Sequence, residues 1–202
     1  LDKGKAADKL KWMARPALSR GNWKNLLKKQ SLFNKYSSDS KFNKLELNKK
    51  FSEFGVITTG LGCNYYFENF ENLPIKPSHL HIGVYPVPTN LIKELSANVD
   101  SLIVIEEGYP FVEKMLNGII NEAIPVHGKL DGTIPADGEL NPDNVRSSIG
   151  LEPREKQNSE TLTLPGRPPQ LCAGCPHTDS FKALNVALED SEESIVTGDI
   201  GC

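Results

Sequence analysis

The sequence predicts an α/β fold in which strands and helices alternate around a doubly wound sheet. Short apolar runs bounded by Gly and Pro recur through the middle of the chain, and segments with helical spacing or helix-capping residues lie between them. Alternation at this spacing is typical of a sheet covered by helices on both faces. We therefore divide the chain into a basic connector, a sheet domain, a linker and the beginning of a second domain, at residues 1–50, 51–150, 151–170 and 171–202.

The first fifty residues are predicted to be helical or irregular. Apolar residues between Trp23 and Phe33 fall at helical spacing, so we expect an amphipathic helix that packs on another element and ends in the serine-rich run at 37–40. The segment has too few large apolar residues to fold alone. We expect it to lead out of an upstream domain, since the chain does not begin with Met.

The strands and helices of the sheet domain follow in order. Strands are expected at residues 54–60, 80–84, 102–105 and 124–127, the last at an edge because it contains Pro125. Helices are expected at residues 65–70, at 90–97 with Thr89 as its cap, at 111–123 with Pro110 in its first turn, and at 142–149 with Asn141 as N-cap and Pro142 at N1. In the second domain, we expect a helix at 179–188 and a strand at 194–197.

Composition and charge exclude several classes of protein. The chain is 38% hydrophobic and 24% charged, as expected for a globular protein, and no apolar stretch is long enough to span a membrane. No signal peptide is visible, so we expect a cytoplasmic location. Residues 1–50 carry fourteen Lys and Arg against four Asp and Glu, but the lysines are scattered and lack interleaved aromatics. We interpret them as a solvated helix face and expect neither nucleic acid nor membrane as a partner.

The cysteines are concentrated at the end of the chain. Three of the four lie in the last 31 residues, and Cys172 and Cys175 form a C-x-x-C just before a predicted helix, with Gly174 allowing a tight turn. Cys202 follows a predicted strand, where open α/β sheets place their ligands, so the three sulfurs could converge. Spacing alone leaves four interpretations open: a [4Fe–4S] cluster, a thiol-lined cofactor pocket, a zinc site, or a thioredoxin-like redox pair.

Several motifs together resemble one known family. The two most specific are Arg167-Pro-Pro-Gln-Leu-Cys-Ala-Gly-Cys-Pro-His177 and Val196-Thr-Gly-Asp-Ile-Gly-Cys202. Phe54-Gly-Val-Ile-Thr-Thr-Gly60, Tyr85-Pro-Val-Pro88 and Val104-Ile-Glu-Glu-Gly-Tyr-Pro-Phe-Val-Glu113 precede them in the expected order, as does Gly128-Lys with Gly138-Glu-Leu-Asn-Pro142. With these motifs the chain resembles an internal fragment of the alpha subunit of indolepyruvate ferredoxin oxidoreductases, within the 2-oxoacid:ferredoxin oxidoreductase family.

The resemblance implies an architecture. Residues 51–150 would be a three-layer α/β/α domain like the C-terminal domain of transketolase, with a mostly parallel five-stranded sheet. Residues 171–202 would begin the α/β domain that binds the diphosphate of thiamine. The glutamate that activates the aminopyrimidine would lie in an upstream domain outside this chain, so we expect the fragment alone to be inactive.

The resemblance also implies the site residues. Cys172, Cys175 and Cys202 would be ligands of a [4Fe–4S] cluster near thiamine diphosphate and its Mg²⁺. The cofactor itself would be lined by Gly198, Asp199, Ile200, Gly201 and Cys202. Asp199 could instead cap the next helix, and His177 is a candidate base or hydrogen-bond donor that could equally be a first-turn cap. His177 and Thr178 depart from residues common in relatives, which leaves the cluster less secure than the family.

The implied reaction is the oxidative decarboxylation of aryl 2-oxoacids such as indolepyruvate to acyl-coenzyme A, in an oxygen-sensitive enzyme. Electrons would pass through iron–sulfur clusters to ferredoxin, and a beta subunit would be a partner. Two alternatives remain: a non-oxidative thiamine diphosphate-dependent decarboxylase or transferase, and a zinc-stabilised interaction module without catalytic activity. The three thiols argue against the first, because such enzymes need no C-x-x-C beside the cofactor.

Five further positions carry reactive side chains without a clear pattern. Glu106 and Glu107 end a predicted strand and are interpreted as helix caps or an interdomain contact rather than an acid–base pair. Cys63 follows a glycine pattern too short for a dinucleotide fingerprint and is interpreted as a packed apolar residue. His79 and His81 alternate on one strand, and without a third ligand nearby we favour structural roles.

Overall fold

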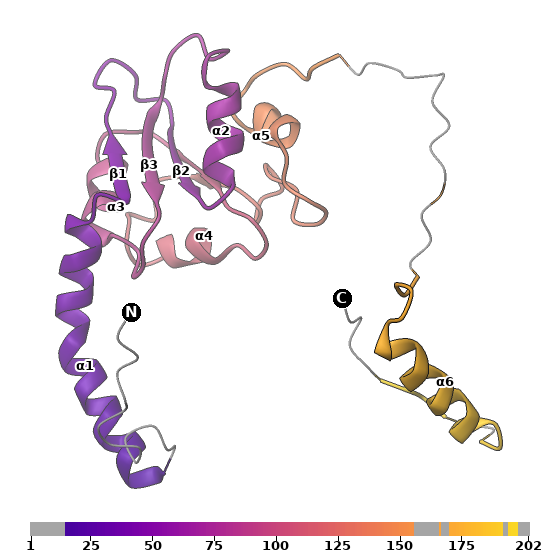
Figure 1. Ribbon diagram of the computed structural model, residues 1–202. Helices are drawn as coiled ribbons and strands as arrows, with labels where there is room; N and C mark the ends of the chain where they lie inside the picture. The colour runs from indigo at the N-terminus through magenta and orange to yellow at the C-terminus, as the bar shows by residue number, and fades with distance from the viewer. Residues whose placement is uncertain (1–14, 156–165, 167–169, 192–193, 198–202) are drawn as a thin grey trace. The chain divides into compact units, whose positions relative to one another are not determined.

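The computed structural model describes residues 15–155, 166, 170–191 and 194–197 (Figure 1). The chain divides into two compact units, residues 1–155 and residues 156–202, and each is described by itself. No helix in the described ranges is long and apolar enough to cross a membrane.

The first unit is built on a five-stranded sheet with the strand order β1-β3-β2-β4-β5. Its strands are β1 (Asn43–Glu46), β2 (Gly55–Thr59), β3 (Ser78–Ile82), β4 (Leu102–Ile105) and β5 (Val126–His127). β1 runs antiparallel to β3, and the other neighbouring pairs are parallel. The predicted α/β fold with a mostly parallel sheet is therefore confirmed, as is the edge position of the strand that follows Pro125.

Helices α2 (Gly62–Phe70) and α5 (Pro142–Ser148) cover one face of the sheet, and α3 (Thr89–Ser96) and α4 (Phe111–Leu116) cover the other. The long helix α1 (Pro16–Asp39) precedes the sheet and is mostly exposed, with Ser37 buried near its end. Successive residues of the central strand face opposite cores, because side chains alternate along a strand. Val56 packs in one core with residues of α2 and α5, and Ile57 packs in the other with residues of α3 and α4. The carboxyl ends of β2, β3 and β4 therefore lead to helices on different faces, which makes the sheet doubly wound.

The first strand is a difference from the sequence prediction, which placed residues 43–46 in the connector. β1 has no apolar run, so periodicity did not reveal it. Its place is set by the side chain of Asn43, whose amide nitrogen donates to the carbonyls of Ser37 and Val84. The amide oxygen of Asn43 accepts from the backbone N–H groups of Gly83 and Val84. These bonds join the end of α1, the start of β1 and the end of β3.

Three helix predictions can be compared directly with the structure. Asn141 caps α5 as expected, with its side-chain oxygen accepting from the N–H groups of Asp143 and Asn144, each at 3.0 Å. Thr89 does not cap α3: it is the first helical residue, and its hydroxyl donates to the carbonyl of Val87 at 3.5 Å. The helix from residue 111 ends at Leu116 rather than at 123, because Asn117 leaves helical geometry and Gly118 adopts a φ of 86°.

The described part of the second unit contains one helix, α6 (Pro176–Leu188), which begins three residues before its predicted start. Pro176 occupies its first turn, where the missing N–H costs nothing. The strand expected at residues 194–197 is not formed, and this expectation is wrong for the structure described. The segment is exposed, with Ile195 at 93%, and no described strand pairs with it.

Candidate cofactor site

The C-x-x-C of the second unit forms a tight turn at the start of α6. The N–H of Cys175 donates to the carbonyl of Cys172 at 3.1 Å, and the N–H of Thr178 donates to that of Cys175 at 3.0 Å. Gly174 adopts a φ of 77°, a conformation that residues with a Cβ rarely take, so the glycine expected to permit the turn does so. Cys172 is exposed and Cys175 half-buried, and neither forms a disulfide.

His177 lies in the first turn of α6 beside this pair. Its Nδ1 is 3.5 Å from the Sγ of Cys175, and its ring is tilted against Phe181 with centroids 6.3 Å apart. A helix N-terminus with free N–H groups favours a thiolate over a thiol. The turn therefore presents two soft ligands next to a helix N-terminus, with an imidazole in hydrogen-bonding reach of one of them.

The remaining predicted cofactor residues lie outside the described residues. These are Gly198, Asp199, Ile200, Gly201 and Cys202. The convergence of Cys202 on Cys172 and Cys175 thus stays a prediction. Within the described ranges, no group of three or more His, Cys, Asp or Glu side chains is arranged to hold a metal ion.

The paired glutamates after β4 accept hydrogen bonds from backbone N–H groups. The carboxylate of Glu106, 3% exposed, accepts from the N–H groups of Phe111, Val112 and Glu113 at 3.1, 2.8 and 2.9 Å. Glu107 accepts from the N–H of Leu140 at 3.3 Å. Glu106 therefore caps α4, one of the roles expected for it, and its lone pairs are engaged by backbone donors rather than free for acid–base work.

The two histidines of β3 share one hydroxyl. Thr58 Oγ1 lies 2.9 Å from His79 Nε2 and 3.1 Å from His81 Nδ1, so the threonine donates to one ring and accepts from the other. His79 is 4% exposed, and burial lowers its pKa to about 4. It is neutral at pH 7, as a histidine held by packing should be. Cys63 is half-buried and lines a cavity with both rings, an arrangement the sequence did not indicate.

Two buried groups escaped the sequence analysis. Glu113, 4% exposed, accepts from the N–H groups of Lys129 and Leu130 and ties α4 to the loop after β5. Tyr66 is fully buried, and its hydroxyl has no hydrogen-bond partner among the described residues. In the sequence, only the Gly128-Lys129 pair indicated the contact of Glu113, because a glycine often marks a position that another group approaches closely.

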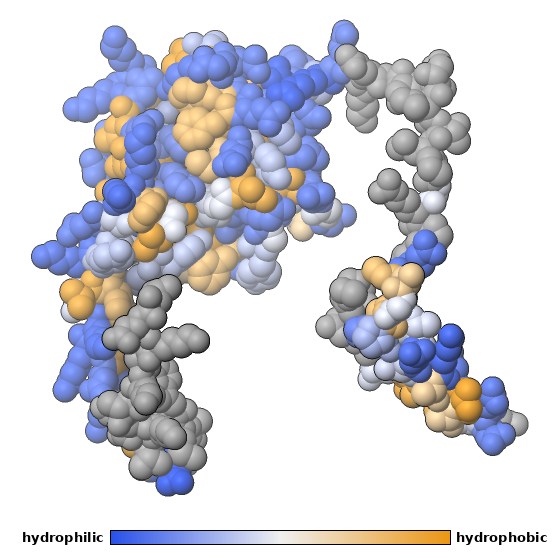
Figure 2. All heavy atoms as spheres, in the orientation of Figure 1, coloured by the Kyte–Doolittle hydropathy of each residue, from blue (hydrophilic) through white to orange (hydrophobic). Residues whose placement is uncertain are grey.

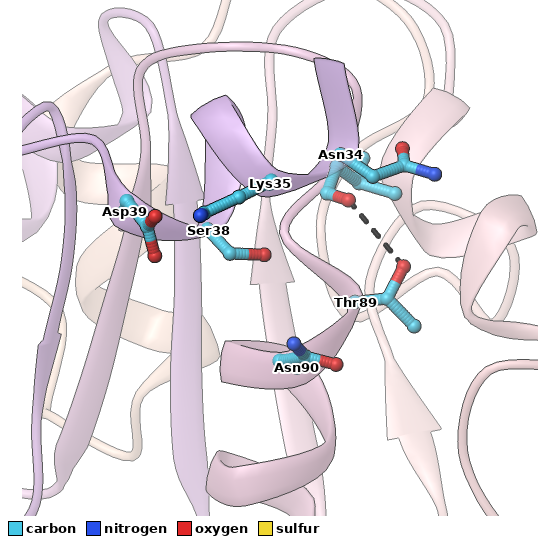
Figure 3. A pocket seen from close by; sticks show the side chains of 7 residues that line it. Asn34, Lys35, Ser38, Asp39, Thr89 and Asn90 are labelled. Atoms are coloured by element: carbon cyan, nitrogen blue, oxygen red, sulfur yellow. Dashed lines mark hydrogen bonds between the residues drawn. The ribbon is translucent and has the colours of Figure 1, made fainter. Parts of the chain in front are cut away.

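A groove with several polar side chains lies between α1 and α3 (Figure 3). It measures about 440 Å³ and is walled by the last turns of α1 and the first turn of α3. Its polar side chains are Asn34, Lys35, Ser38, Asp39, Thr89 and Asn90. The walls contain neither a thiol nor an imidazole, so the groove lacks the chemistry expected at the cofactor.

Comparison with known proteins identifies relatives along nearly the whole chain. No family model matches it. The indolepyruvate oxidoreductase subunit IorA of Methanothermobacter thermautotrophicus is 33% identical over 198 residues, covering 93% of this chain and 32% of that subunit. The IorA subunits of Methanothermobacter marburgensis and Archaeoglobus fulgidus are each 31% identical, over 93% of this chain and 32% and 31% of their own lengths.

The chain is therefore similar to subunits of 2-oxoacid oxidoreductases as a class. More particularly, the predicted resemblance to the alpha subunit of indolepyruvate oxidoreductases is confirmed. The chain spans about a third of the length of the curated relatives it matches. Among solved structures, a 2-oxoglutarate:ferredoxin oxidoreductase from Magnetococcus marinus matches 68% of this chain and 23% of its own, with 15% identity and a TM-score of 0.49. A likeness at that level carries no argument about function.

Proposed function

We propose that the chain is part of an enzyme that oxidatively decarboxylates aryl 2-oxoacids, with indolepyruvate as the type substrate. The similarity to IorA subunits over 93% of the chain carries this proposal. The products would be an acyl-coenzyme A, carbon dioxide and two electrons for ferredoxin. A beta subunit would complete the enzyme.

Thiamine diphosphate with Mg²⁺ and an iron–sulfur cluster would supply the carbanion stabilisation and one-electron transfer that protein side chains cannot provide. The C-x-x-C fits the cluster in the chemistry of its donors. Cys172 and Cys175 offer two thiols across a turn opened by Gly174, and cluster ligands in proteins are cysteine thiolates. Cys202 would be the third ligand, and a fourth would lie outside residues 1–202.

The chain's own residues would have limited tasks in this enzyme. Cys172 and Cys175 would hold the cluster at the N-terminus of α6. His177, 3.5 Å from Cys175 Sγ, would donate a hydrogen bond to that sulfur and tune its charge. The segment Gly198–Cys202 would line the diphosphate of thiamine through backbone N–H groups. In the first unit, Glu106 and Glu113 would position the backbone rather than react, since their carboxylates are engaged by backbone donors.

The test uses the full-length protein with its beta subunit, purified without oxygen. Cys172→Ser should remove the proximal cluster, so iron and acid-labile sulfide per protein should fall by the content of one cluster. Reduction of a viologen dye that depends on indolepyruvate and coenzyme A should fall by at least about a hundredfold, because electron transfer loses its first carrier. Cys63→Ser is the matched control, since Cys63 lies in the first unit, and it should keep both iron and turnover.

Each alternative predicts a different outcome. Zinc in place of iron, with no turnover of any aryl 2-oxoacid, would favour the interaction module. Decarboxylation without dye reduction would favour a non-oxidative enzyme. Full iron content and full turnover in Cys172→Ser would contradict the role assigned to this thiol.

A further inference from the structure

A cavity of about 440 Å³ lies at the β1–β3 side of the first unit's sheet. Its lining residues come from β1, β3, α2 and the segment just before β1, and Phe67 of α2 contacts the ring of His79 on β3. Lys44 and Glu46 of β1 stand opposite His81 and His79 of β3 in the strand register, and all four line the cavity. In the space-filling view, hydrophobic surface is exposed between the positions of β1 and α2 (Figure 2).

Two phenyl rings form the apolar walls of this cavity. Phe42 precedes β1 and is 57% exposed, and Phe67 on α2 is 44% exposed. Aromatic rings are expensive to leave in water, and paired aromatic walls suit a flat apolar ligand. The cavity is thus built to receive a planar ring rather than an ion alone.

The polar groups of the cavity favour a single negative charge. Lys44 pairs with Glu46 at 2.5 Å, which compensates both charges. Lys41 makes no ion pair with any described residue, and its Nζ lies 5.5 Å from the centroid of the Phe42 ring. His81 uses its Nδ1 on Thr58, and its Nε2 lies toward Gly83, another lining residue. One uncompensated ammonium and one imidazole nitrogen match a monoanion better than a multiply charged phosphate.

We propose that this cavity binds an aromatic carboxylate, with its ring between Phe42 and Phe67 and its carboxylate held by Lys41 and His81. This binding site goes beyond the proposed function, because it needs neither the cofactor nor turnover.

Cys63 provides a reporter inside the cavity, and N-acetylcysteine in the same solution provides a reference thiol. The full-length protein is treated with iodoacetamide, and alkylation of each thiol is followed by mass spectrometry. Indole-3-acetate, an aryl carboxylate without a 2-oxo group, should slow alkylation of Cys63 about tenfold at ten times its Kd and leave alkylation of the reference thiol unaffected. Equilibrium dialysis of labelled indole-3-acetate gives the same Kd independently of thiol reactivity.

Two further probes separate the requirements for ring and charge. Indole, which lacks the carboxylate, and cyclohexylacetate, which lacks the aromatic ring, should each protect Cys63 at least about tenfold more weakly, a difference of 1.4 kcal/mol. Equal protection of Cys63 by indole would contradict the requirement for a carboxylate. Stronger protection by a nucleotide would contradict the preference for a single negative charge. No protection of Cys63 up to the solubility limit of indole-3-acetate, with no binding in dialysis, would overturn the proposal.

Variants assign the site to named residues. Phe42→Ala and Lys41→Ala should each weaken binding several-fold, whereas Lys50→Ala, an exposed lysine outside the cavity, should not. Unchanged binding in Phe42→Ala and Lys41→Ala would contradict the site. Turnover with indolepyruvate should persist in these variants, so failure here is distinct from failure of the proposed enzymatic function.

Discussion

At the scale of single residues, the buried carboxylate of Glu113 shows how one side chain fixes a loop. It lies between α4 and the turn after β5, where it accepts from Lys129 N at 2.8 Å and Leu130 N at 3.2 Å. Burial, opposed by these two hydrogen bonds, raises the pKa of Glu113. The carboxylate can approach the backbone this closely only because residue 128 has no Cβ.

Gly128→Ala should therefore destabilise the first unit. A Cβ at this position would lie 2.6 Å from Glu113 Oε2, so the carboxylate must move and its backbone bonds must lengthen. We expect a loss of about 2 kcal/mol in the free energy of unfolding, measured by urea titration. Gly21→Ala is the control: its Cβ meets nothing within 4 Å inside α1, so it should be neutral or stabilising. Equal effects of the two substitutions would show that the close approach does not matter.

At the scale of secondary-structure elements, α4 depends on a cap from outside its own sequence. It is only six residues long, and its N-cap residue, Pro110, has no side-chain acceptor. Glu106, at the end of the preceding strand, supplies the acceptor for three of its N–H groups. The negative charge also lies favourably at the helix N-terminus. Strand and helix are thus coupled through one carboxylate.

Glu106→Ala should cost about 3 kcal/mol in the free energy of unfolding, because three donors in a buried region lose their acceptor together. Glu106→Gln keeps one acceptor oxygen and should cost less. Glu107→Gln is the matched control, since Glu107 is exposed and makes a single bond of 3.3 Å, and it should stay within about 0.5 kcal/mol of the wild type. Urea titrations of the three variants test the order. If Glu107→Gln lowered the free energy of unfolding as much as Glu106→Ala, the capping of α4 by Glu106 would not explain the loss.

At the scale of the whole molecule, the sequence predicted those elements whose pattern is local. β2, β4 and the capped helix α5 follow from apolar runs and from the Asn141-Pro142 pair. β1 could not be predicted, because its place depends on pairing with β3 and on the bonds of Asn43 to distant backbone groups. The same limit applies to the sites. The turn at Gly174 was visible in the sequence, whereas the meeting of Cys63 with His79 arises only when α2 packs on the sheet.

The buried histidine gives the molecule a pH-dependent stability. The pKa of His79 is about 4 in the folded protein, against an ordinary value of 6.5 in the unfolded chain, so between these values the unfolded chain binds more protons than the folded one. The free energy of unfolding contributed by this group is complete above pH 6.5 and is lost as the pH falls toward 4, by about 3 kcal/mol at most. In His79→Gln, which retains a hydrogen-bonding group opposite Thr58, that loss should disappear. Urea titrations of both proteins at pH 7 and near pH 4.5 measure it: the stability difference between wild type and variant should shift in favour of the variant at the lower pH. Parallel pH profiles for the two proteins would show that His79 is solvated or protonated in the fold, and the packing of Tyr66 on its ring would then not keep it neutral.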